Sequence, residues 1–178
     1  MATNVRGAGW SVLVWGGATL LLLAPAVAMR FTTEVQWTGF DFAVFGAMLL
    51  LGCSAFEFVS RRSNGLLFTL GTAMAVGTAF FLLWANLAVG LIGDEGNRAN
   101  LMYIGVLLTA IVGACVARFR PRGMSRAMVA AGVAQAVVGA IALVGKLGDS
   151  QIETFGVTAM FVVLWMAASV LFAKSATR

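Results

Sequence analysis

The sequence LLFTLGTAMAVGTAFFLLWANLAVGLI, at residues 66–92, contains no charged side chain and no proline. A helix that crosses a hydrocarbon layer of about 30 Å needs about 20 apolar residues, and this run exceeds that length. Within lipid the backbone N–H and C=O groups must be satisfied internally, which leaves α-helices or closed barrels. Barrel strands are only about 10 residues long, so the run predicts a transmembrane helix.

Five further runs that are mostly apolar flank this segment. They lie at residues 9–29, 40–59, 101–117, 125–147 and 152–173, and short polar connections separate them. Hydrophobic residues make up 61% of the 178-residue chain and charged residues only 11%, far from the composition of a soluble globular protein. We therefore predict an all-α fold, with residues 1–178 forming a single domain of six bundled transmembrane helices.

The first run has a second interpretation. Arg6, the apolar stretch after it and the small residues at 24–28 (APAVA) resemble a secretory signal peptide with its cleavage site. The apolar stretch of about 20 residues is longer than a signal peptide needs, and five more spans follow it. These features favour an uncleaved first helix.

Basic residues are distributed unequally between the two sides that six spans create. Nine of the 12 lysines and arginines lie at the termini and in the second and fourth loops, and three lie in the other loops. Short cytoplasmic loops carry an excess of Lys and Arg, so both termini are predicted in the cytoplasm. The nine are Arg6, Arg61, Arg62, Arg118, Arg120, Arg122, Arg126, Lys174 and Arg178.

These basic loops predict lipid partners. Anionic headgroups are expected near Arg61, Arg62, Arg118, Arg120, Arg122 and Arg126. The formal charge of +5 also raises the question of nucleic acid, but residues 118–122 are a short loop without a nucleic-acid-binding module. We therefore expect contact with lipid headgroups and no nucleic acid.

Several residue types that carry common chemistry are missing. The chain has no histidine, which is the usual haem ligand, the commonest zinc ligand and the usual general base. Its two cysteines are too few for an iron–sulfur cluster, and it lacks a phosphate-binding loop of the Gly-x-x-x-x-Gly-Lys-Ser/Thr type. We expect no cofactor, no metal and no catalytic residue, which favours a protein without enzymatic activity.

Two polar residues inside the predicted spans are candidates for function, because such groups are unfavourable in lipid. Glu57 precedes Arg61 by four residues, so an ion pair near the interface is the structural explanation and a proton relay is the functional one. Gln135 lies among small residues of the fifth span, which favours close packing and an amide hydrogen bond across the contact. The third span has a similar small-residue row, Gly71, Ala75 and Ala79, as a possible partner.

The acidic residues concentrate on the outer side, where a cation site is one interpretation. Thr38 to Asp41 and Ser150 to Glu153 match the capping box of a helix start, and Asn100 is a plausible cap for the fourth helix. Capping explains Asp41 and Glu153 structurally, so we prefer it to a cation site.

An ordered outer cap is predicted for residues 85–100. Residues 66–84 already supply about 28 Å of helix, and the residues that follow, 85–100, contain Asn86 and three glycines. The oxygen-rich loop does not have the spacing of an EF-hand, so no metal is expected. The candidate ligand or partner residues of this side are Glu34, Trp37, Asp41, Trp84, Asn86, Asp94, Glu95, Asn97, Arg98 and Asn100.

Four segments resemble an uncharacterised family of small bacterial inner-membrane proteins. They are EVQWTGFDF (34–42), WANLAVGLIG (84–93), NRANLMY (97–103) and ARFRPRGM (117–124). The resemblance implies a multi-pass protein of the bacterial inner membrane and no particular activity. Family members often carry Ser-Glu-Asp-Asn-Pro where this chain has DEGNR (94–98), which makes a fixed ligand set in this loop less secure.

Three classes of function remain open. The first is a non-enzymatic accessory or scaffold subunit, with a membrane protein or a second copy of the chain as its partner. The second is a small ion or solute transporter or channel, with Glu57, Asn86 and Gln135 lining the path. The third is a lipid-acting membrane enzyme, which would need the outer polar residues to converge.

Overall fold

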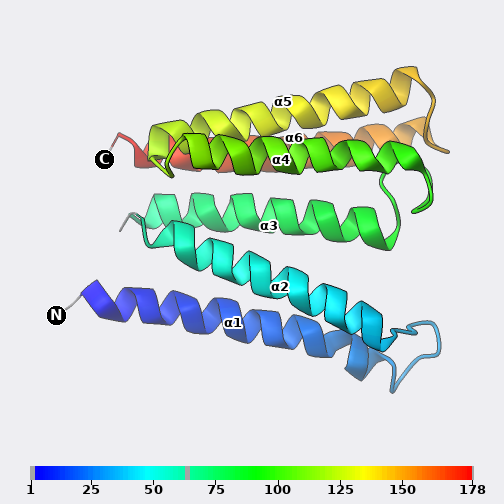
Figure 1. The fold of residues 1–178 in the computed structure, drawn as a ribbon, viewed down its shortest axis with the longest axis horizontal. Coiled ribbons are helices and arrows are strands. Elements are labelled where there is room, and N and C mark those ends of the chain that lie inside the picture. The colour runs from blue at the N-terminus through cyan, green and yellow to red at the C-terminus, as the bar shows by residue number, and fades with distance from the viewer. Residues whose placement is uncertain (1–2, 63–64, 178) are drawn as a thin grey trace. The chain divides into compact units, whose positions relative to one another are not determined.

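The computed structural model describes the backbone of residues 3–62 and 65–177, with side chains from residue 9 onward. The side chains of Arg6 and Arg178, which the topology prediction uses, lie outside this description. The described chain forms six α-helices and one 3₁₀ turn (Figure 1). These are α1 (Thr3–Ala28), α2 (Gly39–Ser60), α3 (Leu66–Ala88), η1 (Arg98–Leu101), α4 (Met102–Val116), α5 (Pro121–Val144) and α6 (Gln151–Ser175).

Each helix is long and apolar enough to cross a membrane, with η1 and α4 counted together as one span. The prediction of an all-α protein with six such helices is therefore confirmed, and the chain is a multi-pass membrane protein. It divides into two compact units, Met1–Arg61 with α1 and α2, and Arg62–Arg178 with α3 to α6. Each unit is described by itself below.

The first unit is an antiparallel helical hairpin. Gly46 of α2 faces Leu22 of α1, and Cys53 lies near the Val14 carbonyl, with 3.9 Å between Sγ and O. The predicted capping box starts α2 (Gly39–Ser60), because Thr38 Oγ1 accepts from Asp41 N and Asp41 Oδ2 accepts from Thr38 N. These two bonds satisfy helix-terminal N–H groups that have no partner within the helix.

The second unit is a bundle in which small residues allow helix backbones to approach closely. A Cβ placed on Gly113 of α4 would lie 2.8 Å from Ala127 Cβ of α5. A Cβ placed on Gly139 of α5 would lie 2.2 Å from Thr158 Cγ2 of α6. Gly71 of α3 also meets α6, at Phe172. The small-residue rows of the third and fifth spans therefore share α6 as a partner helix.

The two ends of the second unit differ in charge. We call the end with residues 89–97 and 145–150 the acidic end, and the end with residues 117–120 and the C-terminus of α6 the basic end. At the acidic end α3 stops at Ala88, before the apolar run does, because Gly90 and Gly93 adopt left-handed φ values of +70° and +69°. Ile92 between them is 0% exposed, so this loop folds back on the bundle.

Candidate functional site

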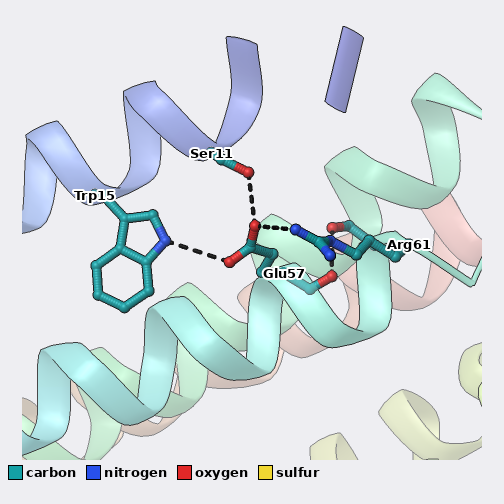
Figure 2. Close-up of polar contacts among 5 residues, drawn as sticks. Ser11, Trp15, Glu57 and Arg61 are labelled. Carbon is teal, nitrogen blue, oxygen red and sulfur yellow. Dashed lines mark hydrogen bonds and ion pairs between the residues drawn. The ribbon is translucent and has the colours of Figure 1, made fainter. Parts of the chain in front are cut away.

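Glu57 of α2 is the centre of a polar network in the first unit (Figure 2). Its Oε1 accepts from Ser11 Oγ at 2.8 Å and its Oε2 accepts from Trp15 Nε1 at 3.3 Å. Arg61 lies one helical turn after Glu57, at the end of α2, and its Nη2 donates to Oε1 at 2.5 Å. The carboxylate therefore has donors from both helices of the hairpin.

The ion pair expected from the four-residue spacing of Glu57 and Arg61 is present. Sequence reasoning missed the two donors on α1, although Ser11 and Trp15 are themselves four residues apart and so share a helix face. The Glu57 side chain is 26% exposed and the Arg61 side chain 73% exposed, as expected at the end of a span. The bonds from Ser11 and Trp15 join α1 to α2, and the ion pair lies within α2, so the described contacts of Glu57 are structural.

Asn100 organises the loop at the acidic end of the second unit. It is 5% exposed, and its Oδ1 accepts from the backbone N of Leu91 at 3.0 Å and of Ile92 at 2.9 Å. Its Nδ2 donates to the carbonyl of Asp94 at 2.7 Å and to that of Ile92 at 3.4 Å. Asn100 was expected to cap the fourth helix, and that prediction is wrong because its side chain binds the preceding loop instead.

Asn97 performs the capping that Asn100 does not. Its Oδ1 accepts from Ala99 N at 2.9 Å, at the start of η1 (Arg98–Leu101). Its Nδ2 donates to the Leu147 carbonyl at 2.8 Å, which joins this loop to the α5–α6 connection. Asn86 Nδ2 donates to the Asn100 carbonyl at 3.4 Å. Three of the predicted site residues, Asn86, Asn97 and Asn100, are thus brought together.

The remaining candidates of the second unit lie at its surface. Asp94, Glu95 and Arg98 are exposed, and Trp84 stacks on Phe81 with a centroid distance of 6.1 Å. Within the described residues, no group of three or more Cys, Asp or Glu side chains could hold a metal ion.

Three candidates belong to the first unit. Glu34 is exposed, Asp41 forms the capping box, and Trp37 makes edge-to-face contacts with Phe42 and Phe45, each at 5.3 Å. Asp41 and Trp37 therefore stabilise the start of α2, and their contacts are structural.

Gln135 is completely buried in the second unit, at 0% exposure. The expected hydrogen bond across its helix contact is not formed, since neither amide atom bonds to a described protein group. Four other residues also have a buried polar atom without a hydrogen-bond partner among the described residues. Asn86 is the one of these four that the sequence analysis proposed as a candidate site residue. They are Asn86 Oδ1, the Tyr103 hydroxyl, the Thr158 hydroxyl and Trp165 Nε1.

The missed residues carried weak signals. Trp165 lies deep in its span, away from the interface where tryptophan is usual, and Tyr103 is the chain's one tyrosine. No family model, curated protein or solved structure matches the chain. The six apolar helices show a six-helix membrane protein, and the resemblance to a bacterial family stays a prediction.

Proposed function

We propose that the protein is a non-enzymatic accessory or scaffold subunit that packs against another membrane protein within the bilayer. The observation that carries this proposal is the network at Glu57. A carboxylate inside a span is a functional candidate by default. Here Ser11, Trp15 and Arg61 bind it, so its charge serves to join α1 to α2.

The polar side chains at the acidic end support the same proposal. Asn97 and Asn100 bind backbone groups of their own loop, and Asn97 also binds the Leu147 carbonyl of the α5–α6 connection. Such bonds order a surface, and an ordered surface is what a scaffold presents to its partner.

The partner surface that we propose lies on α1. Within the described part of the first unit, a Cβ added to Gly16 or Gly17 of this helix would meet nothing within 4 Å. Small residues at helix contacts in membranes allow close backbone approach, and the described contact of α1 with α2 does not use these two glycines. A helix of a partner protein, or α1 of a second copy, would fit this face.

Copurification tests the proposal. The tagged protein is extracted from its native membranes in mild detergent, and bound proteins are identified for the wild type and for Gly16→Leu. Gly105→Leu is the matched control, because a Cβ on Gly105 of α4 also meets nothing within 4 Å. We expect Gly16→Leu to lose the partner and Gly105→Leu to keep it. A wild-type protein that is a solitary monomer in several detergents would contradict the proposal.

A transporter or channel is the second candidate function, and the buried Gln135 is the observation that favours it. An amide with both polar atoms unpaired inside a span is expected where a polar solute passes. Flux into liposomes would be measured for a panel of ions and small solutes with the wild type, Glu57→Gln and Gln135→Leu. Background flux in all three would eliminate this candidate.

We further propose that the basic end lies in the cytoplasm and binds anionic lipid headgroups. Arg118, Arg120, Arg122 and Arg126 are exposed there, and the Arg62 guanidinium lies 5.6 Å from the centroid of the Phe119 ring. Each arginine near an anionic surface contributes about 1 kcal/mol of attraction. Replacing Arg118, Arg120 and Arg122 by glutamine should lower the anionic lipid that copurifies, as measured by lipid mass spectrometry. Unchanged lipid content would contradict this proposal.

A further inference from the structure

The core of the second unit contains polar atoms that no described protein group satisfies. Gln135 and Trp165 are 0% exposed, and Tyr103 is 1% exposed. Both amide atoms of Gln135, the indole N–H of Trp165 and the hydroxyls of Tyr103 and Thr158 lack hydrogen-bond partners among the described residues. Unpaired polar groups are strongly disfavoured in an apolar interior, and native proteins usually pair them with protein or with ordered water.

The packing of α5 on α6 places three of these groups along one contact. A Cβ on Gly139 would lie 2.2 Å from Thr158 Cγ2, and a Cβ on Gly132 would lie 3.4 Å from Trp165 Cβ. Gln135 is three residues after Gly132 and four before Gly139, so it lies on the same face of α5. The Gln135 amide therefore belongs to the α5–α6 contact, at a level between Thr158 and Trp165.

The helix rise gives the scale of this arrangement. Thr158 and Trp165 are seven residues apart on α6, which corresponds to about 10 Å along the helix axis. The Tyr103 hydroxyl of α4 lies close to the Thr158 hydroxyl of α6, so these two groups interact with each other, although neither forms a hydrogen bond of good geometry. These polar groups are thus contributed by three neighbouring helices, α4, α5 and α6.

The chemistry of these groups selects a class of ligand. The amide both donates and accepts, the hydroxyls do the same, and the indole N–H only donates. None of the four side chains is a carboxylate or a cation, so none supplies a full charge to offset that of a charged ligand. Water is the smallest neutral molecule with both donors and acceptors, and buried water typically makes about three hydrogen bonds to such groups.

We propose that Gln135, Trp165, Thr158 and Tyr103 form an internal site that binds water between α4, α5 and α6. The acidic end is the side from which water enters, because Thr158 and Tyr103 lie toward that end of their helices. Asn86 Oδ1, near the end of α3, is also unpaired there. The site is independent of the proposed scaffold function, since neither α1 nor a partner contributes to it.

Water-edited solid-state NMR tests the proposal on the full chain in lipid bilayers. The protein is labelled with ¹⁵N at glutamine side chains and tryptophan indoles, and magnetisation transfer from water to these N–H groups is measured. Gln36 and Gln151 are exposed and report the signal of a solvated side chain. We expect transfer to the Gln135 amide and the Trp165 indole at short mixing times. Absence of transfer to both groups in the wild type would overturn the proposal.

Two variants sharpen the test. Gln135→Met keeps the approximate shape of the side chain, removes both amide atoms and should reduce transfer to the Trp165 indole. Thr72→Val is the matched control, because the Thr72 hydroxyl is 1% exposed and already donates to the Phe68 carbonyl at 2.9 Å. Transfer should be unchanged in that variant. If Gln135→Met does not fold, the wild-type spectrum decides. An organic molecule released stoichiometrically on denaturation, detected by mass spectrometry, would overturn the assignment to water.

Discussion

A carboxylate inside a membrane span is tolerated when donors surround it, and Glu57 meets this condition with groups from two helices. Ser11 and Trp15 approach it from α1, and Arg61 approaches from its own helix. The arginine is mostly exposed, so solvent and headgroups screen its share of the interaction. The contacts with α1 therefore hold the hairpin together more than the ion pair does.

The thermal stability of variants at Glu57 should depend on which polar atoms the new side chain keeps. Glu57→Gln keeps an acceptor near Ser11 and Trp15, whereas Glu57→Leu removes the acceptor that both of these donors share. We expect the midpoint of thermal unfolding to fall slightly for Glu57→Gln and clearly further for Glu57→Leu. Circular dichroism of the detergent-solubilised protein measures it. Equal midpoints for the two variants would show that the α1 donors contribute nothing.

Asn100 should be among the residues most sensitive to substitution in the second unit. Its side chain is 5% exposed and forms four hydrogen bonds with the backbone at residues 91, 92 and 94. Asn100→Ala should lower the free energy of unfolding by about 2–4 kcal/mol, because buried backbone groups lose their partners. Asn100→Asp keeps the oxygen that accepts two of the bonds, so its free energy of unfolding should lie between those of the wild type and Asn100→Ala. Equal stability of Asn100→Ala and wild type would contradict this role.

At the scale of the helices, close approach of α5 and α6 depends on positions without a side chain. Gly139 lies against Thr158 and Gly132 lies against Met166 and Trp165. Within lipid the hydrophobic effect does not drive helices together, so packing and hydrogen bonding between them determine their association. A methyl group at Gly139 would therefore require Thr158 or its helix to shift, whereas one at Gly132 would mainly displace the flexible end of Met166.

Gly139→Ala should destabilise the second unit by about 1–3 kcal/mol, because the added Cβ would lie 2.2 Å from Thr158 Cγ2 and 2.5 Å from Thr158 Oγ1. Gly156→Ala on α6 is the matched control, since a Cβ there meets nothing within 4 Å. Unfolding of both variants by denaturant in mixed micelles provides the comparison. The packing role of Gly139 is refuted if the two variants are equally stable.

At the scale of the whole molecule, charge is expected to set the orientation of the six helices. Nine basic residues lie in or next to the termini and the second and fourth loops, against three in or next to the other loops. The positive-inside rule then predicts cytoplasmic termini. The same orientation would expose the acidic end of the second unit, with its loops joined through Asn97 and Leu147, on the outer side.

Reporter fusions in a bacterial host test this orientation. A green fluorescent protein joined after the C-terminus should fluoresce, and alkaline phosphatase at the same position should be inactive, because the first folds in the cytoplasm and the second in the periplasm. Alkaline phosphatase joined after Gly148, between α5 and α6, should be active. The reverse pattern would show that the N-in/C-in prediction is wrong.

The sequence by itself determined the class of the fold and the number of its helices. Lipid forces each span to satisfy its own backbone, so an apolar run of sufficient length specifies a helix with little help from the rest of the chain. Features within a few residues of each other were predictable for the same reason. The capping box of Thr38 and Asp41 and the pair of Glu57 and Arg61 are examples.

Only the tertiary structure decided which side chains meet across helices and loops. Ser11 is 46 residues from Glu57 in the sequence, yet the two side chains form a hydrogen bond. Asn100 binds the loop that precedes it, and no local sequence pattern indicated this contact. The unpaired state of Gln135 depends on what α4 and α6 place beside it. These contacts follow from how each helix is rotated about its axis, and that rotation results from many weak packing contacts between distant residues, which local sequence patterns do not encode.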